Sequence, residues 1–327
     1  MKKSTKIFMS FLFIILFGSM ISTAVYVRVV SEKEATETEQ QADETEQQTE
    51  QTQQTTSETN WTQYSTTDFF DSPFPNIGVT AVTAPLGENI ISAFSKNTDD
   101  SGTVLHYYTI DEIFNTLLSR ECDIVLSPAP SEEMQQQYGA SLDFIPISNE
   151  AIVFLVNKKN SIQNLYLEDI QNIYSGQVTS WENFTREEKD IIAYQKPENS
   201  LLQYLFHSLV LSQGSMMSPP QQIRINENYE LEKVISNYDG GEYAIGYDTY
   251  YYANTMLYDY NIKMLSIDGI YPTKRNIAKG IYPIMTNYYA VVRANSYTES
   301  PEQKLVQYLT SQTGQELIKQ SGYIPLS

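Results

Sequence analysis

The chain has 327 residues, which is long enough for two lobes with a sizeable hydrophobic core and a tail. Its formal charge of −19 argues against a surface that binds nucleic acid or anionic lipid, so we expect no nucleic-acid partner. The single cysteine, Cys122, excludes an internal disulfide and a thiolate metal cluster, and its apolar neighbours are typical of a buried cysteine. The two histidines, His106 and His207, lie far apart, and we expect neither a metal site nor a cofactor.

The first element is a membrane-directed segment. Three lysines, Lys2, Lys3 and Lys6, precede Ile7–Val27, a run of 21 residues without a charge. As a helix this run would extend about 31 Å, which matches the hydrocarbon core of a bilayer. The basic flank keeps the N-terminus inside. Residues 1–30 are therefore predicted to form a signal anchor that crosses the cell membrane once, with the globular part outside the cell.

The residues around and after this run decide how the globular part is attached. Ser22, Thr23 and Ala24 offer small residues for a signal peptidase, so the alternative is a protein secreted after cleavage near Ala24. Residues 31–60 consist almost wholly of Glu, Gln and Thr and are too polar to bury a core. They are predicted to be a disordered linker that reaches roughly 30 Å from the membrane.

From Trp61 onward, apolar runs alternate with segments of helical periodicity, which is typical of an α/β fold. Strands are predicted at Ile77–Val82, Thr103–Tyr107, Asp123–Leu126, Ala151–Val156, Ile191–Ala193, Ala244–Tyr247, Met264–Ile267 and Tyr289–Val292. Helices are predicted at Glu88–Ser95, Ile110–Ser119, Glu132–Tyr138, Leu167–Tyr174, Leu201–Leu211, Glu230–Asn237, Pro301–Leu309 and Gly314–Gln320.

The segment Asn164–Phe184 has a distinctive order of residues. Its predicted helix begins with two acidic residues, which favour the helix dipole, and Gly176 follows as a C-terminal cap. With Trp181 further on, the order resembles the "Leu-Thr, helix, Ile-Phe-Ser-Gly, then Asn/Ser-Trp" block of the phosphate-type solute-binding proteins of bacterial ABC importers. The block contributes no loop to that family's anion site, so we interpret its apolar residues as packing of a lobe.

Further motifs that resemble this family follow one another in the family's order. They include a strand that enters a second lobe, a "Gly-Ala-Ile-Gly-Tyr" strand that returns from it, and a C-terminal signature. The matching segments are Ala151–Asn157, Tyr243–Tyr247, Ile267–Thr273, Gly280–Ile284, Gly314–Gln315 and Gly322–Leu326.

The resemblance implies an α/β fold of the two-lobed, type 2 periplasmic-binding-protein kind, preceded by the transmembrane helix and the disordered tether. Two crossovers, near Glu150 and Gly246, would join the lobes. The first lobe would comprise residues 61–150 and 246–327, and the second residues 151–245. The implied function is that of the phosphate-binding component of an ABC importer, with a small-molecule solute as ligand and an ABC permease as partner.

In that family an anion is held by helix N-termini and by small residues before them, where orphan N–H groups and the helix dipole favour negative charge. In the first such loop Thr80 and Thr83 are the hydroxyls in reach, and Thr83 is also a candidate helix cap. In the third loop Ser127 keeps the family's hydroxyl, which is a turn-capping serine in the alternative interpretation. Pro128 follows it, where some members have an aspartate that accepts the phosphate proton.

The second loop lacks the expected glycines and serines. Thr109 and Glu112 have the spacing of a capping box, in which the helix satisfies its own orphan donors. Asp111 places a carboxylate in the first turn. At ~4 Å and an effective dielectric constant of about 20, it would repel an anion by ~4 kcal/mol.

The fourth loop has lost both arginines of the family's motif, and Tyr194 or Gln195 stands where the upstream arginine would be. Ser200 and Gln203 again have capping-box spacing, with Asn199 just before them. Together the loops supply the candidate ligand-binding residues Thr80, Thr83, Thr109, Ser127, Asn199, Ser200 and Gln203.

Two hypotheses stay open at this point. The first is a membrane-tethered, extracellular solute-binding protein of the phosphate-importer type. The alternative is a binding-fold protein that takes another solute, or none, and serves as a scaffold or sensor at the cell envelope. A basic residue that reaches in from elsewhere, such as Arg224 or Lys274, would count against the alternative. An enzyme is not expected, because no nucleophile lies near a base in a recognisable spacing.

Overall fold

The computed structural model describes residues 74–94, 105–186, 188–198, 200–211, 216–217, 235, 241–256 and 261–326. The chain divides into two units, and all of these residues belong to the unit 60–327. The predicted signal anchor and linker lie outside the described residues. In the part of the chain that is described, no helix is both long enough and apolar enough to cross a membrane.

The first lobe is built on a mixed sheet with the strand order β2–β1–β3–β10–β4. The strands β2, β1 and β3 are parallel, and β10 pairs antiparallel with both of its neighbours. Their bounds are β1 (Ile77–Val79), β2 (Leu105–Tyr107), β3 (Ile124–Pro128), β4 (Leu142–Asn157) and β10 (Met285–Arg293). All three parallel strands therefore end at the same edge of the sheet.

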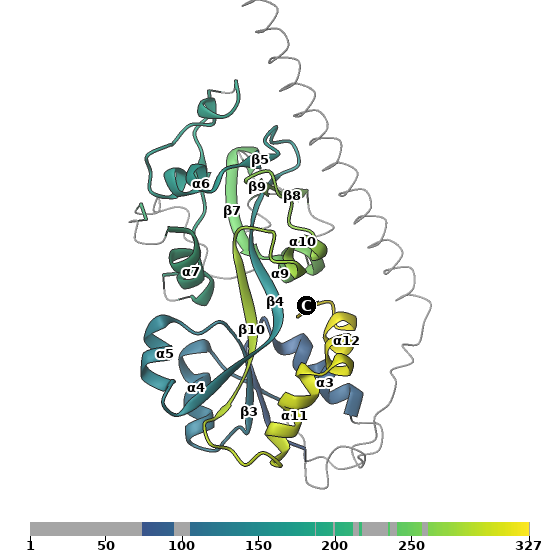
Figure 1. The fold of residues 1–327 in the computed structure, drawn as a ribbon. Coiled ribbons are helices and arrows are strands. Elements are labelled where there is room, and N and C mark those ends of the chain that lie inside the picture. Colours follow the sequence, from purple (N-terminus) through teal and green to yellow (C-terminus); the bar gives the residue numbers. More distant parts are fainter. Residues whose placement is uncertain are drawn as a thin grey trace, which may run out of the picture. The chain divides into compact units, whose positions relative to one another are not determined.

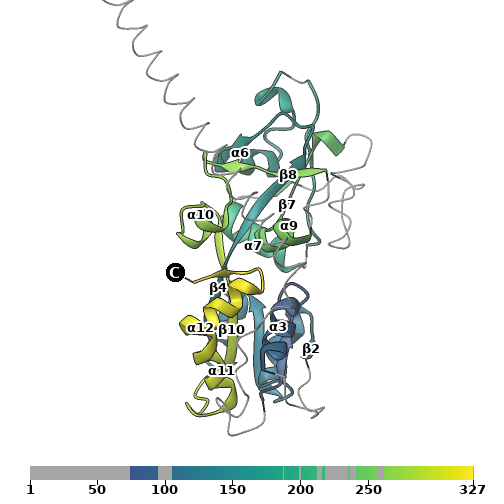
Figure 2. The same cartoon turned by 90° about the vertical axis from the view of Figure 1, so that its right-hand side faces the viewer.

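Helices cover both faces of this sheet (Figures 1 and 2). Along β3, Ile124 and Leu126 pack in a core with α3, α11 and α12, whereas Val125 points to the other face, into a core with α4 and α5. This alternation follows from the period of two in a strand, and with both faces covered every residue of β3 is buried. The helices are α3 (Ala84–Phe94), α4 (Ile110–Leu118), α5 (Glu132–Tyr138), α11 (Pro301–Thr310) and α12 (Gln312–Gln320).

The second lobe contains the other end of β4, which pairs antiparallel with β7 and β8, and β6, which pairs parallel with β7. A separate two-stranded sheet joins β5 to β9. The strands are β5 (Asn164–Leu165), β6 (Ile192–Ala193), β7 (Ala244–Thr249), β8 (Ile262–Met264) and β9 (Ser266–Ile267). The helices are α6 (Leu167–Tyr174), α7 (Leu201–Phe206), α9 (Tyr250–Met256) and α10 (Lys274–Ala278), and a π-helical turn, His207–Leu211, extends α7.

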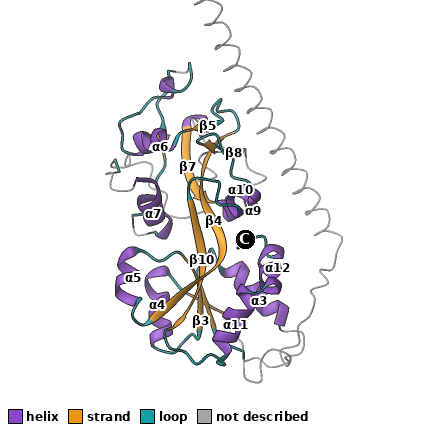
Figure 3. Ribbon diagram, in the orientation of Figure 1, coloured by secondary structure: helices purple, strands orange, loops and turns teal. Residues whose placement is uncertain are grey.

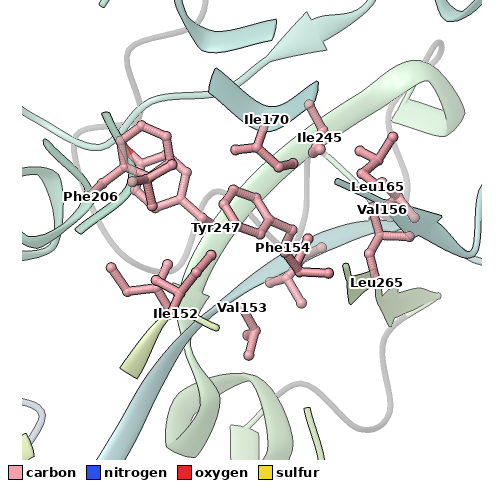
Figure 4. Close-up of a cluster of buried hydrophobic side chains, with 14 of the residues drawn as sticks. Ile152, Val153, Phe154, Val156, Leu165, Ile170, Phe206, Ile245, Tyr247 and Leu265 are labelled. Carbon is pink, nitrogen blue, oxygen red and sulfur yellow. The ribbon is translucent and has the colours of Figure 1, made fainter. Parts of the chain in front are cut away.

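Aromatic rings from four elements meet in the core of the second lobe. Phe206 stacks on Tyr247 with 4.2 Å between ring centroids (Figure 4), and Tyr174 meets Tyr247 edge-on at 5.5 Å. Phe154 of β4 lies 6.1 Å from Phe206 in a T-shaped arrangement. Such geometries are the favourable ones for aromatic pairs, and they fix α6 and α7 against β4 and β7.

β4 is a single strand of 16 residues that contributes to both lobes (Figure 3). Its pairing with β10 ends at Ala151, and its pairing with β7 begins at the next residue, Ile152. The register with β10 shifts between Tyr288 and Tyr289, opposite Ile147, next to Pro146. A bulge bends a strand and tolerates a neighbouring proline, so β4 continues through a sequence that does not read as one strand. The short β11 (Ile324–Pro325) pairs with its centre.

The predicted α/β order is confirmed, with corrections to individual elements. The predicted strand Ile77–Val82 ends at Val79, and the predicted strand Met264–Ile267 is divided between β8 and β9. The first helix begins at Ala84 instead of Glu88, because Pro85 is favourable in a first helical turn. β4 begins at Leu142, nine residues before the predicted strand, and the helices α9 and α10 were not predicted. The predicted helix Glu230–Asn237 lies outside the described residues except for Ile235.

The packing assigned to the Asn164–Phe184 block is confirmed. Ile170, Ile173, Tyr174 and Trp181 are buried in the core of the second lobe. Gly176, just after α6, has a φ of +80°, the left-handed conformation that favours glycine. That core also contains side chains between Ile262 and Ile284, which the predicted division at residue 245 assigns to the first lobe. The division itself stays a prediction. The predicted burial of Cys122 is confirmed.

Candidate functional site

A cavity of about 420 Å³ lies between the carboxyl edge of the first lobe's parallel strands and the start of α7. The loops that follow β1 and β2, and the end of β3, form one wall. Residues of α7 and the end of β7 form the other. This is the position where open α/β sheets bind ligands. We call it the interlobe cavity; its lining residues are Thr80, Ala81, Val82, Tyr108, Thr109, Ile110, Asp111, Pro128, Ser200, Leu201, Leu202, Leu205, Asp248 and Thr249.

One hydrogen bond crosses between the lobes close to this cavity. The backbone N–H of Glu132, in the first turn of α5, donates to the Tyr204 hydroxyl of α7 at 2.8 Å. Tyr204 lies between Leu202 and Leu205, which line the cavity. The bond therefore connects α7, which lines the cavity, to the first lobe.

The first predicted loop is only partly exposed to the cavity. Thr80 lines it, whereas Thr83 is fully buried behind it. The Thr83 Oγ1 accepts from the Thr80 N–H at 3.0 Å and donates to the carbonyl oxygen of Leu126 at 2.7 Å. It also lies 3.1 Å from the Thr80 Oγ1. Thr83 thus holds the turn before α3 against β3, and its hydroxyl is used within the protein.

Thr109 lies at the N-cap position of α4 and lines the interlobe cavity. The predicted capping box is wrong here. The Thr109 hydroxyl donates to the Glu112 carboxylate at 2.9 Å and accepts no backbone N–H, because the Glu112 N–H is bonded to the carbonyl oxygen of Thr109 at 3.2 Å. Asp111 lines the cavity, as its place in the first turn suggested.

The remaining candidates also divide into residues that line the cavity and residues that are buried behind it. Ser200 caps α7 by accepting from the Gln203 N–H at 3.3 Å, and it lines the cavity. Gln203 is buried behind it, where it accepts from the Tyr247 hydroxyl and donates to the Met216 sulfur at 2.9 Å. Ser127 is fully buried and donates to the carbonyl oxygen of Pro128 at 3.0 Å. Asn199 lies outside the described residues. The cavity therefore brings together Thr80, Thr109 and Ser200 of the predicted set.

Sequence reasoning missed a buried ion pair at the wall of the cavity. The Lys196 Nζ lies 2.7 Å from Asp248 Oδ2, and both side chains are at most 5% exposed. Asp248 Oδ1 accepts from the Thr249 N–H at 2.8 Å. Lys196 directly follows Gln195, one of the two residues that the comparison with the family's motif placed at the position of the upstream arginine. The comparison therefore missed this cation by one position. Asp248 gave no signal, because its partner is 52 residues away.

Among the described residues, no lysine or arginine lines the cavity. Lys274, the first residue of α10, is not part of its wall, and Arg224 lies outside the described residues. No group of three His, Cys, Asp or Glu residues in the described part could hold a metal ion. The site can thus offer hydroxyls, carboxylates and apolar surface to a ligand.

A comparison with family models decides the family. Residues 50–313 match the model of the PBP superfamily domain. The chain belongs to the PBP superfamily. A curated relative of this PBP superfamily chain is the phosphate-binding protein PstS of Borreliella burgdorferi, which is 21% identical over 258 residues, 76% of this chain and 88% of the relative.

Two solved structures share the fold. An ABC-type phosphate transport receptor from Vibrio cholerae has a TM-score of 0.60 and 20% identity, over 76% of this chain and 98% of that one. A putative phosphate ABC transporter substrate-binding protein from Clostridium perfringens, solved with bound phosphate, has a TM-score of 0.58 and 18% identity, over 77% of this chain and 100% of that one. The predicted two-lobed α/β fold is thereby confirmed. These relatives are named as binding proteins and receptors.

Proposed function

We propose that this chain is the solute-binding component of an ABC importer and that its ligand binds in the interlobe cavity. The observation that carries the proposal is that Thr80 and Thr109 of the first lobe meet Ser200 of the second on the wall of one cavity. A ligand held there contacts both lobes. A solute-binding protein uses this arrangement to couple occupancy to lobe closure, which a permease can detect.

Phosphate is the first ligand to test, because the matched relatives are named for it. The start of α4 supports an anion to some extent, since the first N–H groups of a helix lack intrahelical partners and the dipole favours negative charge. The carboxylates of Asp111, in the same turn, and of Asp248, on the wall formed by the second lobe, disfavour an anion. These two carboxylates favour the second candidate, a binding protein for another solute.

We further propose that residues 7–27 anchor the protein and that residues 31–60 tether the binding unit outside the cell. Release after cleavage near Ala24 is the alternative. A tether of this reach would leave the cavity near a membrane-embedded permease. The residues concerned lie outside the described part of the chain, and the proposal rests on their sequence.

Binding can be tested by thermal unfolding of the full chain with a panel of solutes that includes phosphate, amino acids, sugars and amines. A ligand at about 100 times its Kd stabilises by about 2.7 kcal/mol, which raises Tm by several degrees. Ala81→Trp would fill the cavity from an exposed turn, and Ala140→Trp, in another exposed turn away from the cavity, is its matched control.

We expect a solute that raises the Tm of the wild type and of Ala140→Trp, and that has a much smaller effect on Ala81→Trp. If no solute of any class stabilises the wild type, or if Ala81→Trp responds as strongly as its control, the proposed cavity is not the binding site.

A further inference from the structure

We propose that the interlobe cavity selects a small organic cation with an apolar body, such as an alkyl amine, and that Asp111 and Asp248 bind its ammonium group. The inference rests on the proposed function and names the class of solute. It is drawn from the size, the charge and the hydrogen-bond polarity of the cavity wall.

The size and the apolar lining suit an organic molecule. Small organic ligands occupy pockets of roughly 300–1,000 Å³ with mostly apolar walls and a few polar groups, and 420 Å³ lies within this range. Half of the fourteen lining residues have apolar side chains, namely Ala81, Val82, Ile110, Pro128, Leu201, Leu202 and Leu205. A tetrahedral oxyanion would leave this apolar surface without a partner.

The charged side chains on the described wall are both carboxylates. Asp111 is exposed and makes no hydrogen bond or ion pair with another described residue. Asp248 is paired with Lys196, but Asp248 lines the cavity and Lys196 does not. Of this ion pair only Asp248 belongs to the cavity wall, and its carboxylate, although 5% exposed and bonded at both oxygens, keeps lone pairs for a second donor.

Like the two carboxylates, the hydroxyl groups at the cavity present hydrogen-bond acceptors to a ligand. The Thr109 hydroxyl donates its hydrogen to Glu112, so that it presents acceptor lone pairs to a ligand. Thr83 donates to the Leu126 carbonyl at 2.7 Å, which leaves Thr80 to donate in the Thr80–Thr83 contact. The Tyr108 hydroxyl donates to the Glu121 carboxylate at 2.7 Å. Three of the five hydroxyl-bearing side chains on the wall, those of Thr80, Tyr108 and Thr109, thus use their hydrogen inside the protein. A donor-rich ammonium group matches such a wall, whereas an oxyanion requires donors.

Three ligands with the same apolar body test this inference. We would titrate the full chain by isothermal calorimetry with 3-methylbutylamine, 3-methylbutan-1-ol and 3-methylbutanoate, and with inorganic phosphate. We expect the amine to bind about tenfold more tightly than the alcohol, the gain from hydrogen bonds to charged groups. Neither the carboxylate nor phosphate should saturate the protein up to roughly 10 mM.

Asp111→Asn should reduce the preference for the amine over the alcohol about fivefold, because an exposed ion pair contributes up to about that factor. Glu133→Gln is the matched control: it removes an exposed first-turn carboxylate of α5 that does not line the cavity, and it should leave the preference unchanged. Rising salt concentration should weaken the binding of the amine and leave the binding of the alcohol unchanged.

The inference is overturned if phosphate or 3-methylbutanoate binds more tightly than the amine, if the amine does not bind, or if Asp111→Asn retains the full preference. Saturable binding of phosphate, blocked by Ala81→Trp, would overturn the ligand class and leave the proposed function standing. A lack of stabilisation by every solute of the panel would overturn the proposed function itself.

Discussion

Glu150 is a carboxyl group buried near the middle of β4, and its side chain lies against the start of α9. Its Oε1 accepts from the Ala151 N–H at 2.8 Å, and the Tyr251 N–H lies 3.2 Å from Oε2. No lysine or arginine of the described residues forms an ion pair with it. Burial raises the pKa of Glu150 to about 7, although both N–H groups oppose this shift.

This pKa predicts how the stability depends on pH. Because the pKa of the folded state lies above the ordinary value of 4.5, the folded state holds the proton more tightly than the unfolded state. The contribution of Glu150 to the free energy of unfolding is fully present below about pH 4.5 and is lost as the pH rises through about 7, a loss of roughly 3 kcal/mol. Urea unfolding across this range should show it.

Glu150→Gln should remove this part of the pH dependence, whereas Glu168→Gln, which changes an exposed carboxylate of α6, should keep it. An unchanged pH slope in Glu150→Gln would mean that Glu150 does not carry the effect.

The Lys196–Asp248 pair gives a second prediction for single residues. Lys196→Met would leave Asp248 buried without its cation, which costs about 3–5 kcal/mol. Replacing both residues, with Lys196→Met and Asp248→Leu, should recover most of this loss, because an apolar pair of similar size needs no charge compensation. Urea unfolding measures both variants. A single variant as stable as the wild type would show that the pair is not held in the buried geometry.

At the scale of elements, one serine connects two helices. Ser311 ends α11 and is also the N-cap of α12, where its Oγ accepts from the Gly314 N–H at 3.2 Å and donates to the Tyr308 carbonyl oxygen at 2.6 Å. Ser300 lies at the N-cap position of α11, but its hydroxyl is buried and has no hydrogen-bond partner among the described residues.

Ser311→Ala should therefore lower the free energy of unfolding by about 1–2 kcal/mol, whereas Ser300→Ala should be close to neutral, since it removes an unsatisfied polar group. Thermal unfolding of the two variants is the measurement. Equal losses would contradict the difference in capping.

Most helices could be predicted because each follows from a local pattern, such as the apolar spacing of Ile170, Ile173 and Tyr174 in α6, whereas α9, α10 and the two-residue strands β5 and β11 were missed. The length of β4 could not be predicted. Its first half contains Pro146 and the exposed Asp143, and it is a strand because β10 pairs with it on both sides of a bulge. A pairing strand about 140 residues away along the chain cannot be recognised from a short window of sequence.

The candidate site was predictable only as a set of loops. The order of motifs indicated which loops meet, and Thr80, Thr109 and Ser200 do line one cavity. The direction of each hydroxyl was not predictable, because the Thr83 hydroxyl is satisfied by Leu126 of a neighbouring strand. For the same reason Lys196 and Asp248, which are distant in sequence, were missed.

At the scale of the described unit, the position of β10 has a consequence for biosynthesis. In the sheet, β10 separates β3 from β4, yet it is made from residues 285–293, long after both. During translation the first lobe's sheet stays in two unconnected pieces until residues 285–293 have emerged. Such long-range pairing folds slowly. A chain that ends before Met285 therefore cannot close the first lobe's sheet, because it lacks the strand that joins β3 to β4.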